Sequence, residues 1–247
     1  MDRRLSNGCW RSDDGRHAGA HAYTCAFLNW TVVAVSCDFS LDHYRELLEA
    51  ATSGGYRFAS FDGVPEPGDL YLRHDVDLSL EAALELARLE HEQGVRATYF
   101  LMTESVFYNL LSKSGERTLR QLREWGHAVG LHAVYPRFEL DERFDPVLAW
   151  HNPDPEYMSQ PVAGAVNVME PPYFDREHYR SDSNQHWRHG CPHEPLARGE
   201  FEWLQLLTHP EIWAFDGATM GETMRTMVDA KRELMLHELA DDRIDLS

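Results

Sequence analysis

The chain has 247 residues and a formal net charge of −18, and 43% of its residues are hydrophobic. This length and composition are typical of one globular domain with a large buried core, and they exclude an intrinsically disordered chain. The excess of acidic side chains argues against nucleic acid and against an anionic membrane surface as partners.

Residues 1–37 follow no hydrophobic periodicity, so we expect an N-terminal extension ahead of one domain that spans residues 38–247. The apolar run over 22–37 resembles a secretory signal with a small-residue cleavage site near Ser36. Polar residues interrupt this run, and it is too short to span a bilayer. The four cysteines are too few for a disulfide framework, and none of them are spaced as in a zinc ribbon. These features favour a cytoplasmic protein, with secretion as the alternative.

From residue 39 onwards the hydrophobic pattern predicts regular elements. A helix over 39–51 has Ser40 as its expected N-cap, and the alternating stretch 56–61 predicts a strand. The run 69–77 predicts a buried strand, followed by an amphipathic helix that ends at Gly94. The further predicted elements are strands over 95–101, 128–133, 147–150 and 164–168, a strand or short helix over 201–208, and helices over 118–125 and 219–240. We expect the methionines and leucines of this last amphipathic helix to fill the core. Strands and helices in this alternation are typical of parallel βαβ units, so we expect an α/β fold such as a (β/α) barrel.

Two carboxylates stand at the end of the strand predicted over 69–77. Residues two apart on a strand point to the same face, so Arg73, Asp75 and Asp77 share one side. Neighbouring carboxylates are costly unless a metal ion, a shared proton or the Arg73 guanidinium compensates their charge. A helix-capping Asp beside a solvated loop Asp is the alternative interpretation.

Polar residues also follow several other predicted strands. In a parallel α/β barrel, catalytic side chains lie at the C-terminal ends of strands and on the loops that follow. The candidates at such positions are Asp75, Asp77, His132, His151, Asn152 and His209, with Asp182 and Trp187 on a loop. Carboxylates and imidazoles that converge on one ion suit zinc, or a similar divalent metal, with an open water position.

Four stretches resemble the polysaccharide deacetylase family, which has the NodB-homology fold. They are Arg-His-Asp-Val-Asp (73–77), Ala-Thr-Tyr-Phe-Leu (97–101), Gly-His-Ala-Val-Gly-Leu-His (126–132) and Leu-Leu-Thr-His-Pro-Glu-Ile-Trp (206–213). The resemblance extends over about residues 39–215. It implies a single irregular (β/α) barrel domain and metal-dependent hydrolysis of an N-acetyl or O-acetyl group.

The resemblance also implies a role for each matching residue. Asp75 would be the general base, and Asp77 and His132 would bind the metal. His209 would protonate the leaving amine.

Four further residues are expected in the substrate-binding part of the site. They are Arg73, Asn152, Asp182 and Trp187. Asn152 lies in the segment that stands where the family has an Arg-Pro-Pro motif. Asp182 and Trp187 fall where the family has an Asp and a Trp that orient the catalytic groups. We expect the histidine-rich stretch 175–199, which contains both, to be a loop that closes over the substrate.

The sequence departs from the family at one metal ligand. The family's second metal histidine lies four residues after the first, where this chain has Pro136. His151 is the nearest strand-end candidate to replace it, and Asp182 is the next. His127 is a poor substitute, because five residues from His132 on a strand place it on the opposite face. We favour a site rebuilt with His151 over a loss of metal binding.

The expected function is therefore that of a metal-dependent hydrolase, with Zn²⁺ as the first expectation for the cofactor. It would remove an acyl group, N-acetyl before others, from an amino sugar or a small N-acylated metabolite. One alternative is a hydrolase of the same fold that cleaves another C–N bond, as in a ureide or a formamide. The other is a catalytically degenerate pseudoenzyme that binds a ligand without turnover. The expected partner is a small molecule or saccharide, and neither nucleic acid nor a membrane.

Overall fold

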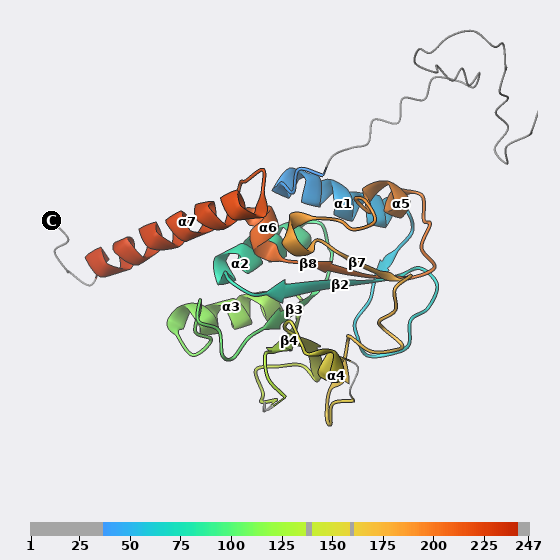
Figure 1. Cartoon of the computed structure of the whole chain (residues 1–247), viewed down its shortest axis with the longest axis horizontal. Coiled ribbons are helices and arrows are strands. Elements are labelled where there is room, and N and C mark those ends of the chain that lie inside the picture. Colours follow the sequence, from blue (N-terminus) through green and yellow to red (C-terminus); the bar gives the residue numbers. More distant parts are fainter. Residues whose placement is uncertain (1–36, 137–139, 159–160, 242–247) are drawn as a thin grey trace, which may run out of the picture. The chain divides into compact units, whose positions relative to one another are not determined.

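The computed structural model describes residues 37–136, 140–158 and 161–241 (Figure 1). The chain divides into two units, Met1–Val35 and Ser36–Ser247, and every described residue belongs to the second. The structure therefore does not test the prediction for the extension, apart from its last residue. That residue, Cys37, packs against the hydrophobic core of the domain.

The domain is built on an eight-stranded sheet in which all paired strands are parallel. The strands are β1 (Arg57–Phe58), β2 (Asp69–Val76), β3 (Thr98–Leu101), β4 (Ala128–Ala133), β5 (Val147–Trp150), β6 (Val166–Asn167), β7 (Tyr179–Ser181) and β8 (Leu204–Thr208). Their hydrogen-bonded order is β6-β5-β4-β3-β2-β8-β7, and β1 pairs with β2. Among the described residues β6 and β7 do not pair with each other, so the barrel is open. The predicted α/β domain of parallel strands is confirmed, as a half-barrel.

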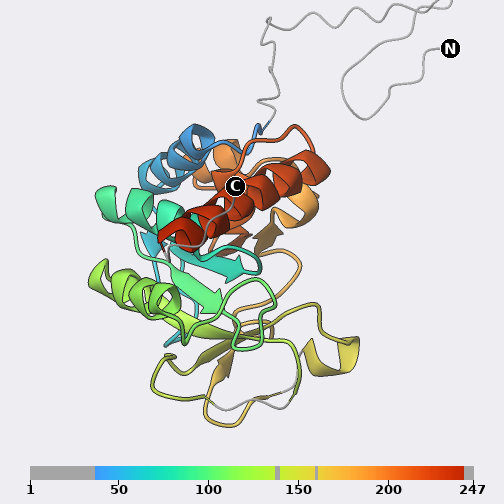
Figure 2. The ribbon, with the colours of Figure 1, turned by 90° about the vertical axis from the view of Figure 1, so that its left-hand side faces the viewer.

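Helices precede, connect and follow the strands along the chain. They are α1 (Leu41–Ser53), α2 (Leu80–Glu92), α3 (Lys113–Glu124), α4 (Pro155–Met158), α5 (His193–Ala197), α6 (Pro210–Ala214) and α7 (Met220–Asp241), with a 3-10 turn η1 (Ser183–Gln185). Ser40, Ser79 and Ser112 cap α1, α2 and α3, because each hydroxyl accepts a hydrogen bond from an otherwise unpaired first-turn N–H. Figure 2 shows these three helices stacked along one side of the sheet. No helix in the described part of the chain is long and apolar enough to cross a membrane.

Strand β2 is the central element, and it is buried along its whole length. Leu70, Leu72 and Val76 belong to the large core cluster that the helices cover. Tyr71 belongs to a second cluster inside the half-barrel. Because side chains alternate along a strand, Arg73 shares the inner face with Tyr71. The site residues that follow on this strand therefore face the interior of the half-barrel.

The outer face of the sheet, which the helices cover, carries a buried network of hydrogen-bonded polar side chains. Glu90 of α2 accepts hydrogen bonds from the hydroxyls of Tyr44 and Tyr99, and its carboxylate lies 2.7 Å from Nε2 of His74. His127 belongs to this side too, since its ring contacts the carbonyl of Ala87 at 3.1 Å. This position agrees with the prediction that His127 does not replace the missing metal histidine.

Two predictions about the second half of the chain need correction. The stretch 175–199 is not a free loop, because it contains β7, η1 and α5, and α5 packs against α1. Helix α7 exists as predicted, but its methionines and leucines do not all fill the core. Met227 is buried, whereas Leu234 is 43% exposed.

Candidate metal centre

Three predicted ligands come together at the C-terminal edge of the sheet. Asp77 follows β2, His132 lies near the end of β4, and His151 follows β5. Oδ1 of Asp77 lies 3.1 Å from Nε2 of His132 and 3.2 Å from Nδ1 of His151. The two ring nitrogens are 3.2 Å apart. Parallel strands end at the same edge, which is why residues from three of them form so tight a triangle.

The donor atoms of this triangle fit a divalent metal. Tetrahedral zinc with bonds of about 2.0–2.1 Å separates neighbouring ligand atoms by roughly 3.3 Å, close to the observed spacing. The Nδ1–H of His132 donates to the carbonyl of Ala149 at 3.1 Å, which leaves a lone pair on Nε2 facing Asp77. Oδ1 of Asp77 is buried and accepts no hydrogen bond of normal geometry from the described residues. A proton on Nδ1 of His151 could bond to Oδ1 of Asp77 but would leave Nε2 of His132 without a partner. One metal cation would be bound by all three atoms.

Asp75 is held by an arginine next to the triangle. The guanidinium of Arg73 donates to both carboxylate oxygens, from Nε at 2.8 Å and from Nη2 at 2.7 Å. Both side chains are almost completely buried. Burial would raise the pKa of Asp75, but the Arg73 charge outweighs it and holds the pKa below its usual value. Asp75 is therefore an ionised carboxylate, with one oxygen 3.7 Å from Nε2 of His132.

Arg73 is also hydrogen-bonded to a residue of a neighbouring strand. Its remaining nitrogen Nη1 donates to Oε1 of Gln205 on β8. The amide of Gln205 in turn donates to the carbonyls of Val168 and Tyr173. These contacts position Asp75, and the substrate-binding role of Arg73 stays a prediction. Nothing in the sequence marked Gln205, because its partners come from distant segments.

His209 and Asp182 form a second charged pair. Nδ1 of His209 lies 2.6 Å from Oδ1 of Asp182, and the other carboxylate oxygen accepts from the His209 backbone N–H and from the indole of Trp213. Burial by itself would lower the pKa of His209, but the charge and hydrogen bond of Asp182 raise it to about 10. His209 is therefore a cation at neutral pH. Asp182 is fully occupied in holding it and contacts the site through it.

A cavity of about 420 Å³ opens over these groups. Asp77, His151, Asn152 and His209 line it, as predicted from the ends of the strands. Glu211 lines it as well and was missed by the sequence analysis. Burial raises the pKa of Glu211 to about 8, and its Oε2 has no hydrogen-bond partner among the described residues. A neutral carboxylic acid thus faces the same cavity, within the motif that delivers His209.

Trp187 and Pro136 complete the comparison with the predicted site. Trp187 is 6% exposed, packs beside Trp213, and donates its indole N–H to Cys37. The structure places it in the core, so a direct substrate contact for Trp187 stays a prediction. Pro136 is exposed in the bend after β4, and His151 lies where a third ligand is needed.

Comparisons with known proteins add little to this geometry. No family model and no curated protein matches the sequence. Among solved structures, a peptidoglycan deacetylase of Bdellovibrio bacteriovorus (Bd3279) is similar, with 15% sequence identity and a TM-score of 0.33. The similarity covers 73% of this chain and 54% of that protein, so the chain spans about half of its length. A likeness of this size assigns no family, and the functional argument depends on the site.

Proposed function

We propose that this protein is a metal-dependent hydrolase that removes an acyl group, N-acetyl before others, from an amino sugar or a small N-acylated metabolite. The observation that carries the proposal is the triangle of Asp77, His132 and His151 beside two oppositely charged groups, Asp75 and His209. An ionised carboxylate and an imidazolium next to one metal site are the base and the acid that hydrolysis of a C–N bond needs.

A divalent cation held by Asp77, His132 and His151 would lower the pKa of a bound water and polarise the acyl carbonyl. Asp75 stays ionised because Arg73 holds it, and it accepts the proton that the attacking water loses. His209 donates its Nε2 proton to the nitrogen as the C–N bond breaks, so the products are a carboxylic acid and an amine. Each proton transfer is usually worth about 10²–10⁴-fold in rate.

The cavity supports a small and partly polar substrate. Its rim includes Phe107 and Tyr135, which are 50% and 62% exposed, and these rings offer an apolar platform. Ser183 and Asn184 supply hydrogen-bonding groups on the opposite loop. Sugar-like ligands need this combination of flat apolar surface and several polar contacts. We propose a cytoplasmic metabolite as substrate, in line with the sequence analysis.

The test combines metal content with turnover. The full chain is loaded with Zn²⁺, and acid release is measured from a panel of N-acetylated amino sugars, ureides and formamides. We expect His132→Ala to lose one equivalent of zinc per chain together with activity. Asp75→Asn should lose activity but keep its zinc content, and the exposed His189→Ala should keep both. An unchanged metal content in His132→Ala would refute the site. Turnover of ureides or formamides alone would keep the site and replace the acetyl substrate.

A further inference from the structure

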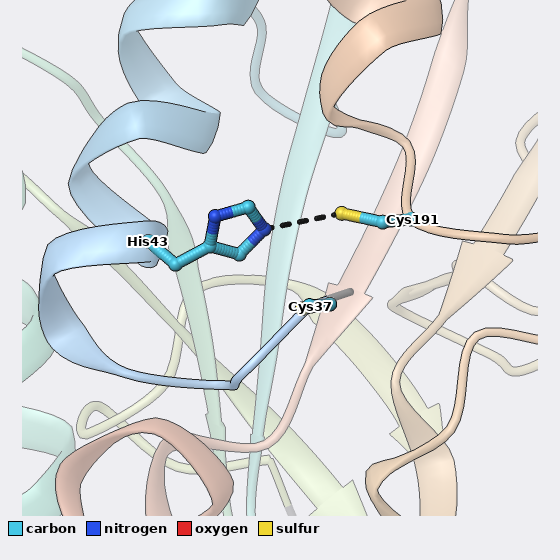
Figure 3. A group of neighbouring side chains, drawn as sticks. All are labelled: Cys37, His43 and Cys191. Carbon is cyan, nitrogen blue, oxygen red and sulfur yellow. Dashed lines mark hydrogen bonds between the residues drawn. The ribbon is translucent and has the colours of Figure 1, made fainter. Parts of the chain in front are cut away.

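A second cluster of metal-binding side chains lies on the helical side of the domain. Cys37 precedes α1, His43 lies in the first turn of α1, and Cys191 precedes α5 (Figure 3). Nε2 of His43 lies 3.2 Å from Sγ of Cys191. The three ligand atoms all lie within 4.8 Å of one another. None of these residues lines the 420 Å³ cavity, so the cluster is separate from the candidate active site.

The groups around the cluster orient its ligand atoms. Nδ1 of His43 lies 3.1 Å from the carboxylate of Glu46, a contact that fixes the Nδ1–H tautomer and leaves the Nε2 lone pair facing Cys191. The indole N–H of Trp187 donates to Sγ of Cys37 at 3.3 Å. A carboxylate behind a histidine and an N–H directed at a sulfur are the outer contacts that support metal ligands in proteins.

A fourth donor stands beside the cluster. The ring of His193 packs edge-on against the ring of His43, with centroids 5.6 Å apart. Its Nδ1 is buried and finds no hydrogen-bond partner in the described part of the chain. His193 is two residues from Cys191 and begins α5, so it lies next to the cluster.

We propose that Cys37, His43 and Cys191 form a structural zinc site, with His193 available for the fourth position. Two thiolates with one or two imidazoles are a donor set that selects zinc over Mg²⁺ or Ca²⁺. The ion ties the start of the domain and α1 to the turn before α5. This inference is independent of the proposed hydrolase activity.

The proposed zinc site also contacts the residues that hold the His209–Asp182 pair. The ring of His43 stacks on Trp213, with centroids 6.3 Å apart, and the indole of Trp213 donates to Asp182. Fixing His43 therefore fixes the tryptophan that holds the partner of His209. The ion acts here on folding and positioning, since no cluster residue reaches the reacting groups.

Cobalt substitution separates the two sites. We expect reduced, full-length protein loaded with Co²⁺ to show thiolate-to-cobalt charge-transfer absorption, which the oxygen and nitrogen ligands of the other site cannot give. The variant Cys37→Ser/Cys191→Ser should lose this absorption and one equivalent of zinc per chain. Cys9→Ser/Cys25→Ser is the matched control and should keep both.

Two results would overturn the proposal. One is the absence of charge-transfer absorption in the reduced, cobalt-loaded wild-type protein. This measurement does not depend on whether any variant folds. The other is a Cys37–Cys191 disulfide in protein isolated without reductant, combined with no zinc bound to cysteine after reduction. His132→Ala should retain the absorption, so failure of the hydrolase proposal leaves this test unaffected.

Discussion

Replacing Asp182 with Asn removes the negative charge that keeps His209 protonated. In the folded protein the carboxylate raises the pKa of His209 to about 10, against the effect of burial. Compared with the ordinary value of 6.5, this corresponds to roughly 5 kcal/mol in favour of the cation. Without that charge, burial is opposed only by the charges of Asp77 and Asp75, and we expect the pKa of His209 to fall well below its wild-type value.

The consequence for catalysis follows from the role of His209 as an acid. In the wild type His209 stays protonated until the pH rises through about 10, whereas in Asp182→Asn we expect it to lose its proton at a lower pH. We expect kcat/KM near pH 8 to fall by about 10²–10⁴-fold, with partial recovery as the pH is lowered. Because the folded-state pKa is raised, the stability that this pair contributes is complete below pH 6.5 and is lost as the pH rises through about 10.

The assay is a pH profile of kcat/KM together with an NMR titration of the His209 ring, which does not depend on a substrate. Trp213→Phe is the control, since it removes one hydrogen bond from Asp182 but keeps the charge, and the His209 pKa should stay high. If His209 titrates at the same pH in Asp182→Asn as in the wild type, Asp182 is not the source of the raised pKa and the assignment of His209 as acid fails.

Three further outcomes are expected. Arg73→Met leaves the buried Asp75 carboxylate unpaired, so chemical denaturation should show a loss of about 3–5 kcal/mol; a loss within 0.5 kcal/mol would contradict the buried pair. Glu211→Gln removes a carboxyl whose pKa is raised from 4.5 to about 8, so the wild type loses stability between those pH values and the variant does not. The variant should gain up to about 5 kcal/mol at pH 9 and nothing at pH 4, and equal curves would show that Glu211 ionises normally. Trp187→Ala should cost about 3–5 kcal/mol of stability as a core residue, and a stable variant with impaired turnover would instead support a direct substrate contact.

The fold and the triangle could be read from the sequence because they depend on local signals. The buried run within 69–77 and the glycine-bounded helices predicted parallel strands, and parallel strands bring their C-terminal residues to one edge. Asp77, His132 and His151 therefore needed only the right strand assignments to be placed together. The family resemblance supplied the expectation of a histidine at position 136, and the strand-end reasoning supplied His151 as its replacement.

The rest depends on contacts between distant segments, which no local pattern encodes. Arg73 donates hydrogen bonds to Asp75 and Gln205, and Gln205 lies on β8, the last strand along the chain. Trp187 falls inside a polar stretch, yet it is buried because η1 and α5 fold that stretch onto α1. The Cys37 and Cys191 thiols approach each other only through this same packing, so their spacing along the chain gave no metal signal.

The central claim is that Asp77, His132 and His151 hold one divalent metal. The most direct test is a crystal structure of the zinc-loaded protein with anomalous diffraction at the zinc edge. We predict an anomalous peak about 2.0–2.2 Å from Oδ1 of Asp77, Nε2 of His132 and Nδ1 of His151. A fully loaded crystal with no peak at this position, or with His151 turned away from it, would contradict the account.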